Sequence, residues 1–174
     1  MKNGFKVLDS DLHTMEPDGL WEQYLDAPFK KLAPQFTRRT ENASNQPLIR
    51  IGGLEIGEMS RRPQTAVVGK DLQRRAFARH PHYEIAHARG YDAESHVAAM
   101  DIEGIDLAVS YGPRGRQVLM HDDLEPEVAA ALARAHNNWT RDFCAHDPRR
   151  LKFAAQIAFH DVALANKEAR RAVR

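Results

Sequence analysis

Residues 93–111, which read AESHVAAMDIEGIDLAVSY, contain the pattern that decides the fold class. The first part, residues 93–103, predicts a helix, and Gly104 supplies its stop signal because glycine is the usual residue just past a helix end. The part that follows, Ile105 to Tyr111, is a near-continuous apolar run, typical of a strand buried on both faces of a parallel sheet. A helix that leads directly into such a strand indicates an α/β fold.

The same alternation continues toward the C-terminus. Pro126 can open a helix whose apolar stripe has spacings of four, three, four and four residues, and consists of Val128, Leu132, Ala135, Trp139 and Phe143. A strand is expected over Leu151–Phe159, and Asp161 can cap a final helix that runs to Arg174. Successive strand–helix units of this kind predict a parallel sheet.

Toward the N-terminus, Phe5–Asp9 predicts a first strand, and Pro17 is expected to open a short helix. A polar region at about 29–90 then interrupts the pattern and resembles an irregular insertion. Within it, Leu48–Ile56 alternates apolar residues around a Gly-Gly pair, which predicts a β-hairpin. We expect a single α/β domain that carries this insertion.

Composition narrows the class of protein. The chain has 174 residues, 43% hydrophobic and 28% charged, which is typical of a globular domain. A net charge of +1 gives no reason to expect nucleic acid or a membrane surface as a partner. The single cysteine, Cys144, excludes an internal disulfide and fits a reducing compartment. We therefore expect a cytoplasmic protein.

Polar residues follow the first predicted strand. Asp11 and His13 are two residues apart, so in an extended chain their side chains point to the same side. A carboxylate and an imidazole that converge at the end of a strand can form half of a metal site. The alternative is that Asp11 is a turn residue and His13 an exposed loop histidine.

The wider pattern resembles a known family. Residues 9–24 read Asp-x-Asp-x-His-x-x-Glu-Pro-x-x-Leu-Trp-x-x-Tyr, which is similar to the opening of the amidohydrolase-related group that includes aminocarboxymuconate-semialdehyde decarboxylase. The resemblance resumes at residues 90–93, 100–109, 137–139 and 147–161. It implies a (β/α)8 TIM barrel, of which this chain holds the N-terminal βα units and therefore an incomplete barrel.

The resemblance also implies a metal site. The family's paired first-strand ligands, commonly His-x-His, fall on Asp11 and His13, with the aspartate as a departure that leaves the metal's identity open. A divalent metal is implied, with zinc as the first candidate and manganese or iron as alternatives. The family's remaining ligands would lie beyond Arg174. The chain is therefore expected to be a fragment, a split-gene half or a shortened form.

Four further residues are candidates for the site at the barrel mouth. Glu16 is a candidate for substrate binding, or alternatively the N-cap of the helix that Pro17 opens. Tyr111 and Arg114 follow the second strand and are expected to bind substrate, with Arg114 able to hold a carboxylate in bidentate fashion. His160 closes the third strand as a possible catalytic acid or base, or as a capping residue.

Three functions remain open on this basis. The first is a metal-dependent hydrolase that acts on a small carbonyl or carboxylated substrate, and the second is a metal-dependent decarboxylase of the same family. The third is a non-catalytic half-barrel module. Because an incomplete parallel sheet leaves strand edges unpaired, we expect the chain to form a homo-oligomer or to bind a second chain that supplies the rest of the barrel.

Overall fold

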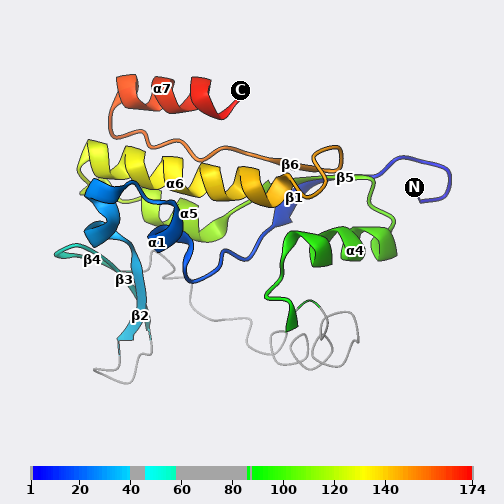
Figure 1. Cartoon of the computed structure of the whole chain (residues 1–174), viewed down its shortest axis with the longest axis horizontal. Coiled ribbons are helices and arrows are strands. Elements are labelled where there is room, and N and C mark those ends of the chain that lie inside the picture. Colours follow the sequence, from blue (N-terminus) through cyan, green and yellow to red (C-terminus); the bar gives the residue numbers. More distant parts are fainter. Residues whose placement is uncertain (1, 40–45, 58–85, 87, 174) are drawn as a thin grey trace.

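The computed structural model describes residues 2–39, 46–57, 86 and 88–173 (Figure 1). Its elements are, in chain order, β1 (Leu8–His13), α1 (Leu20–Tyr24), the 3₁₀ helix η1 (Ala27–Leu32), β2 (Gln35–Arg39), β3 (Gln46–Ile51), β4 (Leu54–Gly57), α4 (Ala93–Glu103), β5 (Leu107–Tyr111), α5 (Pro113–Leu119), α6 (Pro126–Cys144), β6 (Leu151–Phe153) and α7 (Val162–Ala172).

The three strands of the βα units form one parallel sheet in the order β1-β5-β6. His13 of β1 lies opposite Tyr111 of β5, so the two strands end at the same edge of the sheet. Ser110 of β5 pairs in turn with Phe153 of β6. The predicted α/β class with a parallel sheet is confirmed.

Helices cover one face of this sheet. Ala108 of β5 and Leu151 of β6 pack there with Met100 of α4 and Cys144 of α6. The long helix α6 also packs against α1 (Figure 1). Its predicted apolar stripe contributes Leu132 and Trp139 to the larger core cluster, together with a set of buried residues that includes Leu20, Trp21 and Val118.

The opposite face of the sheet is open in the described part of the chain. Leu8 of β1 is exposed, and its neighbours Leu107 and Val109 on β5 are only half-buried. The prediction that this strand is buried on both faces is therefore wrong for the chain as described, although the side facing the helices is buried as expected.

Two helix ends lie where the capping residues in the sequence predict them. Asp92 accepts a hydrogen bond from the Ser95 amide at the start of α4, and Gly104 ends that helix in the left-handed region at φ 74°. Asp161 caps α7 by accepting from the Leu164 amide. These interactions depend on residues within one turn, so the sequence pattern is sufficient to predict them.

Several boundaries differ from the predictions. The first strand is β1 at residues 8–13 rather than 5–9, because pairing with β5 extends it to His13. Helix α1 begins at Leu20 with Gly19 as its N-cap, so Pro17 does not open it. The third strand, β6, spans three residues instead of residues 151–159. Helix α5 was not predicted from the sequence.

The insertion at about 29–90 contains a second sheet. Strands β2, β3 and β4 are antiparallel, with β3 and β4 joined at the Gly52-Gly53 turn as predicted. β2 was not predicted. Residues 40–45, 58–85 and 87 lie outside the described part of the chain. Among the described helices, none is long and apolar enough to cross a membrane.

Candidate functional site

Asp11 and His13 lie together at the carboxyl end of β1. His13 Nε2 is 3.3 Å from Asp11 Oδ1, and 66% and 75% of the respective side chains are exposed. The pairing of β1 with β5 is irregular between Asp9 and Leu12, and the Asp11 amide donates to Asp9 Oδ1. The irregularity interrupts the strict alternation of the strand, and it accompanies the convergence of the two side chains.

The separation of these two atoms is compatible with one bound ion. Zinc lies about 2.0–2.2 Å from nitrogen and oxygen ligands, so two ligands of one tetrahedral ion stand roughly 3.3–3.5 Å apart. The 3.3 Å between His13 Nε2 and Asp11 Oδ1 meets that condition. Among the described residues, however, no group of three or more His, Cys, Asp or Glu side chains gathers to hold a metal.

Tyr111 lies beside His13 on the neighbouring strand, and hydrogen bonds hold this end of the sheet in place. The amide and the hydroxyl of Thr14 both donate to the Tyr111 carbonyl, at 3.2 and 3.4 Å. Ser110 Oγ donates to Thr14 Oγ1 at 3.1 Å, and both of these residues are fully buried. Buried hydrogen bonds therefore hold the backbone at the ends of the two strands that carry the exposed candidates Asp11, His13 and Tyr111.

Glu16 is buried rather than facing solvent. Its Oε1 accepts hydrogen bonds from the amides of Arg114 at 2.7 Å and Gly115 at 3.1 Å, in the first turn of α5. The same oxygen lies 3.4 Å from Nε2 of His136 in α6. Glu16 thus does not cap α1, whose N-cap is Gly19. Its carboxylate instead accepts hydrogen bonds from free backbone amides in the first turn of α5.

Arg114 is occupied by contacts within the chain. Its Nη1 donates to the Glu16 carbonyl at 3.0 Å and to Asp18 Oδ1 at 2.8 Å. The centre of the guanidinium lies 5.3 Å from the ring centroid of Phe36 on β2, which is a cation–π contact. Arg114 therefore joins the loop after β1 to the antiparallel sheet.

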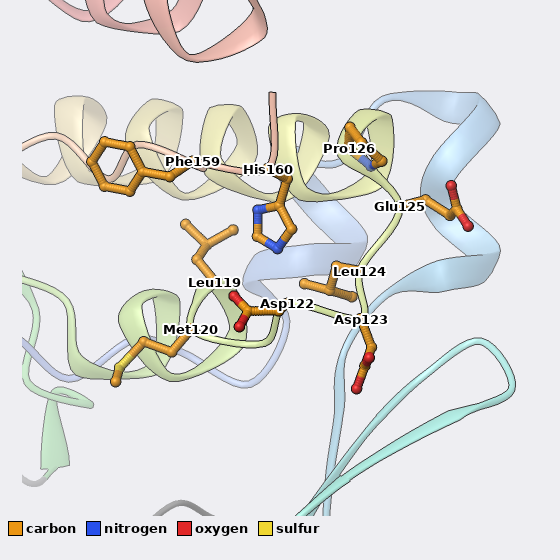
Figure 2. A pocket seen from close by; sticks show the side chains of 9 residues that line it. All are labelled: Leu119, Met120, Asp122, Asp123, Leu124, Glu125, Pro126, Phe159 and His160. Atoms are coloured by element: carbon orange, nitrogen blue, oxygen red, sulfur yellow. The ribbon is translucent and has the colours of Figure 1, made fainter. Parts of the chain in front are cut away.

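His160 lies in a different place from the other candidates. It lines a pocket of about 540 Å³ between the α5–α6 connection and the segment before α7, which none of the other candidate residues lines (Figure 2). Its Nε2 is 2.8 Å from the His121 carbonyl, while its buried Nδ1 has no hydrogen-bond partner in the part of the chain that the structure describes. Burial lowers the pKa of His121, against the opposing charges of Asp123 and Asp122.

Sequence reasoning missed His136, the buried partner of Glu16. A β-carbon at Gly112 or Gly115 would lie 2.1 or 2.4 Å from the imidazole, so both glycines leave room for this ring. The Thr140 hydroxyl, one turn along α6, donates to the His136 carbonyl. The signal available in the sequence was a histidine inside an apolar helical stripe, whereas its contact with the two glycines is visible only in the fold.

No family model matches the chain, and no curated protein matches it. Among solved structures, it is similar to that of an amidohydrolase from Mycobacterium avium subsp. paratuberculosis K-10, with 18% sequence identity and a TM-score of 0.66. The match covers 98% of this chain but 47% of the other, so this chain spans about half the length of that structure. At this identity, the similarity shows a common fold.

Proposed function

We propose that this chain is the N-terminal part of a (β/α)8 TIM barrel, and that the complete barrel is a metal-dependent hydrolase of the amidohydrolase superfamily. The observation that carries the proposal is the convergence of Asp11 and His13, 3.3 Å apart, at the carboxyl end of β1. Active sites of TIM barrels lie at that end of the strands. The similarity in fold to an amidohydrolase supports the choice of superfamily.

Asp11 and His13 would hold the metal, with zinc as the first candidate and manganese or iron as alternatives. When bound, a divalent ion supplies Lewis acidity, which polarises a carbonyl oxygen and makes a water molecule more acidic. Tyr111, beside His13, would orient a small carbonyl or carboxylated substrate. Further ligands must come from residues outside the described set, because catalytic sites usually have three protein ligands.

The open face of the parallel sheet supports the proposal of an incomplete barrel. Among the described residues, β1 and β6 are the edge strands of this sheet, and Leu8 is exposed on the face opposite the helices. Unpaired edges of a parallel sheet invite further strands. We propose that a second copy of the chain, or a second chain that supplies the remaining strands, covers this face.

Metal content tests the assignment. The purified chain is dialysed against zinc and then against metal-free buffer, and its zinc is measured by elemental analysis. We expect a His13→Ala variant to lose zinc that the unaltered chain retains. His146→Ala, at an exposed histidine beyond α6, is the matched control and should retain it. Zinc retained by His13→Ala at the level of the unaltered, zinc-binding chain would contradict the ligand assignment.

The decarboxylase of the same family remains the alternative reaction. The two reactions are separated by their products, since decarboxylation releases carbon dioxide whereas hydrolysis incorporates an oxygen atom from water. Isotopically labelled water in the reaction mixture therefore decides between them. A metal-free chain that folds and self-associates without either product would support the non-catalytic module.

A further inference from the structure

His136 lies in the middle of α6 and is almost completely buried, although histidine is polar. Only 1% of its side chain is exposed. The rings of Trp21 and Trp139 lie beside it, with their centroids 6.4 and 5.7 Å from that of the imidazole. A polar ring in such surroundings needs hydrogen-bond partners, because an unpaired buried nitrogen is costly. The partners of the two ring nitrogens therefore indicate which parts of the chain this residue joins.

The two ring nitrogens of His136 face different elements. Nδ1 is 3.4 Å from Oγ1 of Thr140, one turn further along α6, and the same hydroxyl donates to the His136 carbonyl. Nε2 is 3.4 Å from Oε1 of Glu16, in the loop after β1. Thr140 thus fixes the orientation of the ring, and the ring connects α6 to this loop.

The loop between His13 and Glu16 is anchored at two points. Thr14 donates through its amide and its hydroxyl to the carbonyl of Tyr111, the residue that lies opposite His13 on β5. At the other point, the Glu16 carboxylate accepts from two amides in the first turn of α5 and lies against His136. The second anchor is three residues from His13, so it can affect the position of this candidate ligand.

The strand itself supplies only part of the order at the candidate metal site. The pairing of β1 with β5 is irregular between Asp9 and Leu12, the stretch that includes Asp11. The side chains of Asp11 and His13 are 75% and 66% exposed, so packing does not hold them in place. Their arrangement therefore depends on how firmly the backbone is held. The apparent affinity for an ion falls with the fraction of chains in the binding arrangement.

We propose that His136 is a positioning residue for the metal site. Through Glu16 it holds the loop after β1, and thereby the arrangement of Asp11 and His13 that a metal ion requires. The inference rests on the proposed function, because it concerns the affinity of the same site. It gives a role to a buried contact between residues 120 positions apart, neither of which is a ligand of the ion.

Zinc binding at His13 tests the proposal. Zn²⁺ is titrated into the full chain, and the NMR signals of the His13 ring give the dissociation constant at this site. His136→Met inserts an unbranched apolar side chain without ring nitrogens, and should weaken zinc binding about three- to tenfold. This is less than the loss of about 10–100-fold that follows removal of a direct partner of a ligand. His136→Gln keeps an N–H donor toward Glu16 and should restore most of the affinity.

Asn137→Ala is the matched control. Asn137 is the next residue of α6 and is also buried, with 2% exposed, but its hydrogen bonds lead to Gln156 and Glu168. Its loss should destabilise the chain and leave the zinc affinity at His13 unchanged. An equal weakening in Asn137→Ala and His136→Met would indicate a general loss of stability and would overturn the proposal. An unchanged affinity in His136→Met would also overturn it.

A second measurement requires no metal and separates this proposal from the proposed function. Backbone nitrogen relaxation of the metal-free chain should show greater motion of residues 13–16 in His136→Met, and no change in Asn137→Ala. If the unaltered chain binds no zinc at His13, the proposed function fails, and relaxation still decides whether His136 holds the loop.

A milder variant covers the case in which His136→Met does not fold. Thr140→Val removes only the hydroxyl beside Nδ1 that orients the ring. It should increase the motion of residues 13–16 and weaken zinc binding, each by less than the change expected for His136→Met. Unchanged motion and unchanged affinity in Thr140→Val would then overturn the proposal.

Discussion

The Nε2 atom of His136 lies 3.4 Å from Oε1 of Glu16, and only 1% and 2% of the two side chains are exposed. The contact joins the loop after β1 to the middle of α6, across 120 positions of the sequence. A buried carboxylate is tolerated when it accepts hydrogen bonds, and Oε1 of Glu16 also accepts from two amides of α5. The loop that directly follows the candidate metal ligands of β1 is therefore held in position by a buried contact.

A substitution at Gly112 would test how closely the buried side chains of Glu16 and His136 pack against the start of α5. A β-carbon there would lie 2.1 Å from His136 Nε2 and 2.8 Å from Glu16 Oε1. We expect Gly112→Ala to lower the free energy of unfolding by about 1–3 kcal/mol, as overpacked sites do. Urea titration followed by circular dichroism measures it. Gly53→Ala, which meets nothing within 4 Å, is the control. Equal stabilities of the two variants would refute the close packing.

Removal of the Glu16 carboxylate should cost more than its neutralisation. Glu16→Ala leaves the amides of Arg114 and Gly115 without their acceptor, for an expected loss of about 2–4 kcal/mol of unfolding free energy. Glu16→Gln keeps an oxygen acceptor and should lose less. Guanidinium unfolding curves give both values. If alanine proves no worse than glutamine, these two hydrogen bonds do not hold α5.

The fold could be predicted where its causes are local. Gly104 ends α4 and Asp161 caps α7 through bonds to residues within one turn, and such signals lie within a few letters of sequence. Strand limits were less accurate because they depend on partners: β1 reaches His13 only through its pairing with β5. Pairing between segments about a hundred residues apart leaves no local pattern.

In the candidate site, too, the features with local causes could be predicted from the sequence and those that depend on distant partners could not. The sequence predicted from their spacing that Asp11 and His13 converge, although the strand that brings them together is irregular between Asp9 and Leu12. The partners of Arg114 could not be predicted from the sequence, because Asp18 and Phe36 contact it only in the folded chain. A side chain that looks free in the sequence can thus be bound in the fold.

Asn137 should be a strong determinant of the position of α7. Its side-chain amide donates to Glu168 Oε1 at 2.7 Å and to the Gln156 carbonyl, and its oxygen accepts from the Gln156 amide. Asn137→Ala removes both hydrogen bonds to the backbone of Gln156 and one of the two to Glu168 Oε1, which keeps its bond from Arg171, for an expected cost of about 2–3 kcal/mol. Hydrogen exchange should show faster exchange of the amides in α7. Asn138→Ala, which removes one bond to Arg171, should show a smaller effect.

Acid stability should depend in part on Asp92. Hydrogen bonds from Arg89, followed by those from Ser95, lower the pKa of its carboxyl from 3.8 to about 2. The folded state then favours the charged form, so the stabilisation is present above about pH 4 and is lost as the pH falls toward 2. Solvent screening limits it to about 1 kcal/mol. Asp92→Asn should flatten the pH dependence of unfolding between pH 4 and 2, and an unchanged slope would count against this assignment.

Cys144 should be unreactive until the chain unfolds. The thiol is buried where α6 packs against β6, and burial raises its pKa from 9.0 to about 11, with a small opposing effect of Lys152. The thiolate is the reactive form, and at pH 8 this shift reduces its population at least about 100-fold relative to a free cysteine. Ellman's reagent should therefore label the native chain at least that much more slowly than glutathione, and label one thiol per chain in urea. Labelling of the native chain at the rate of glutathione would mean that α6 does not cover β6 as described.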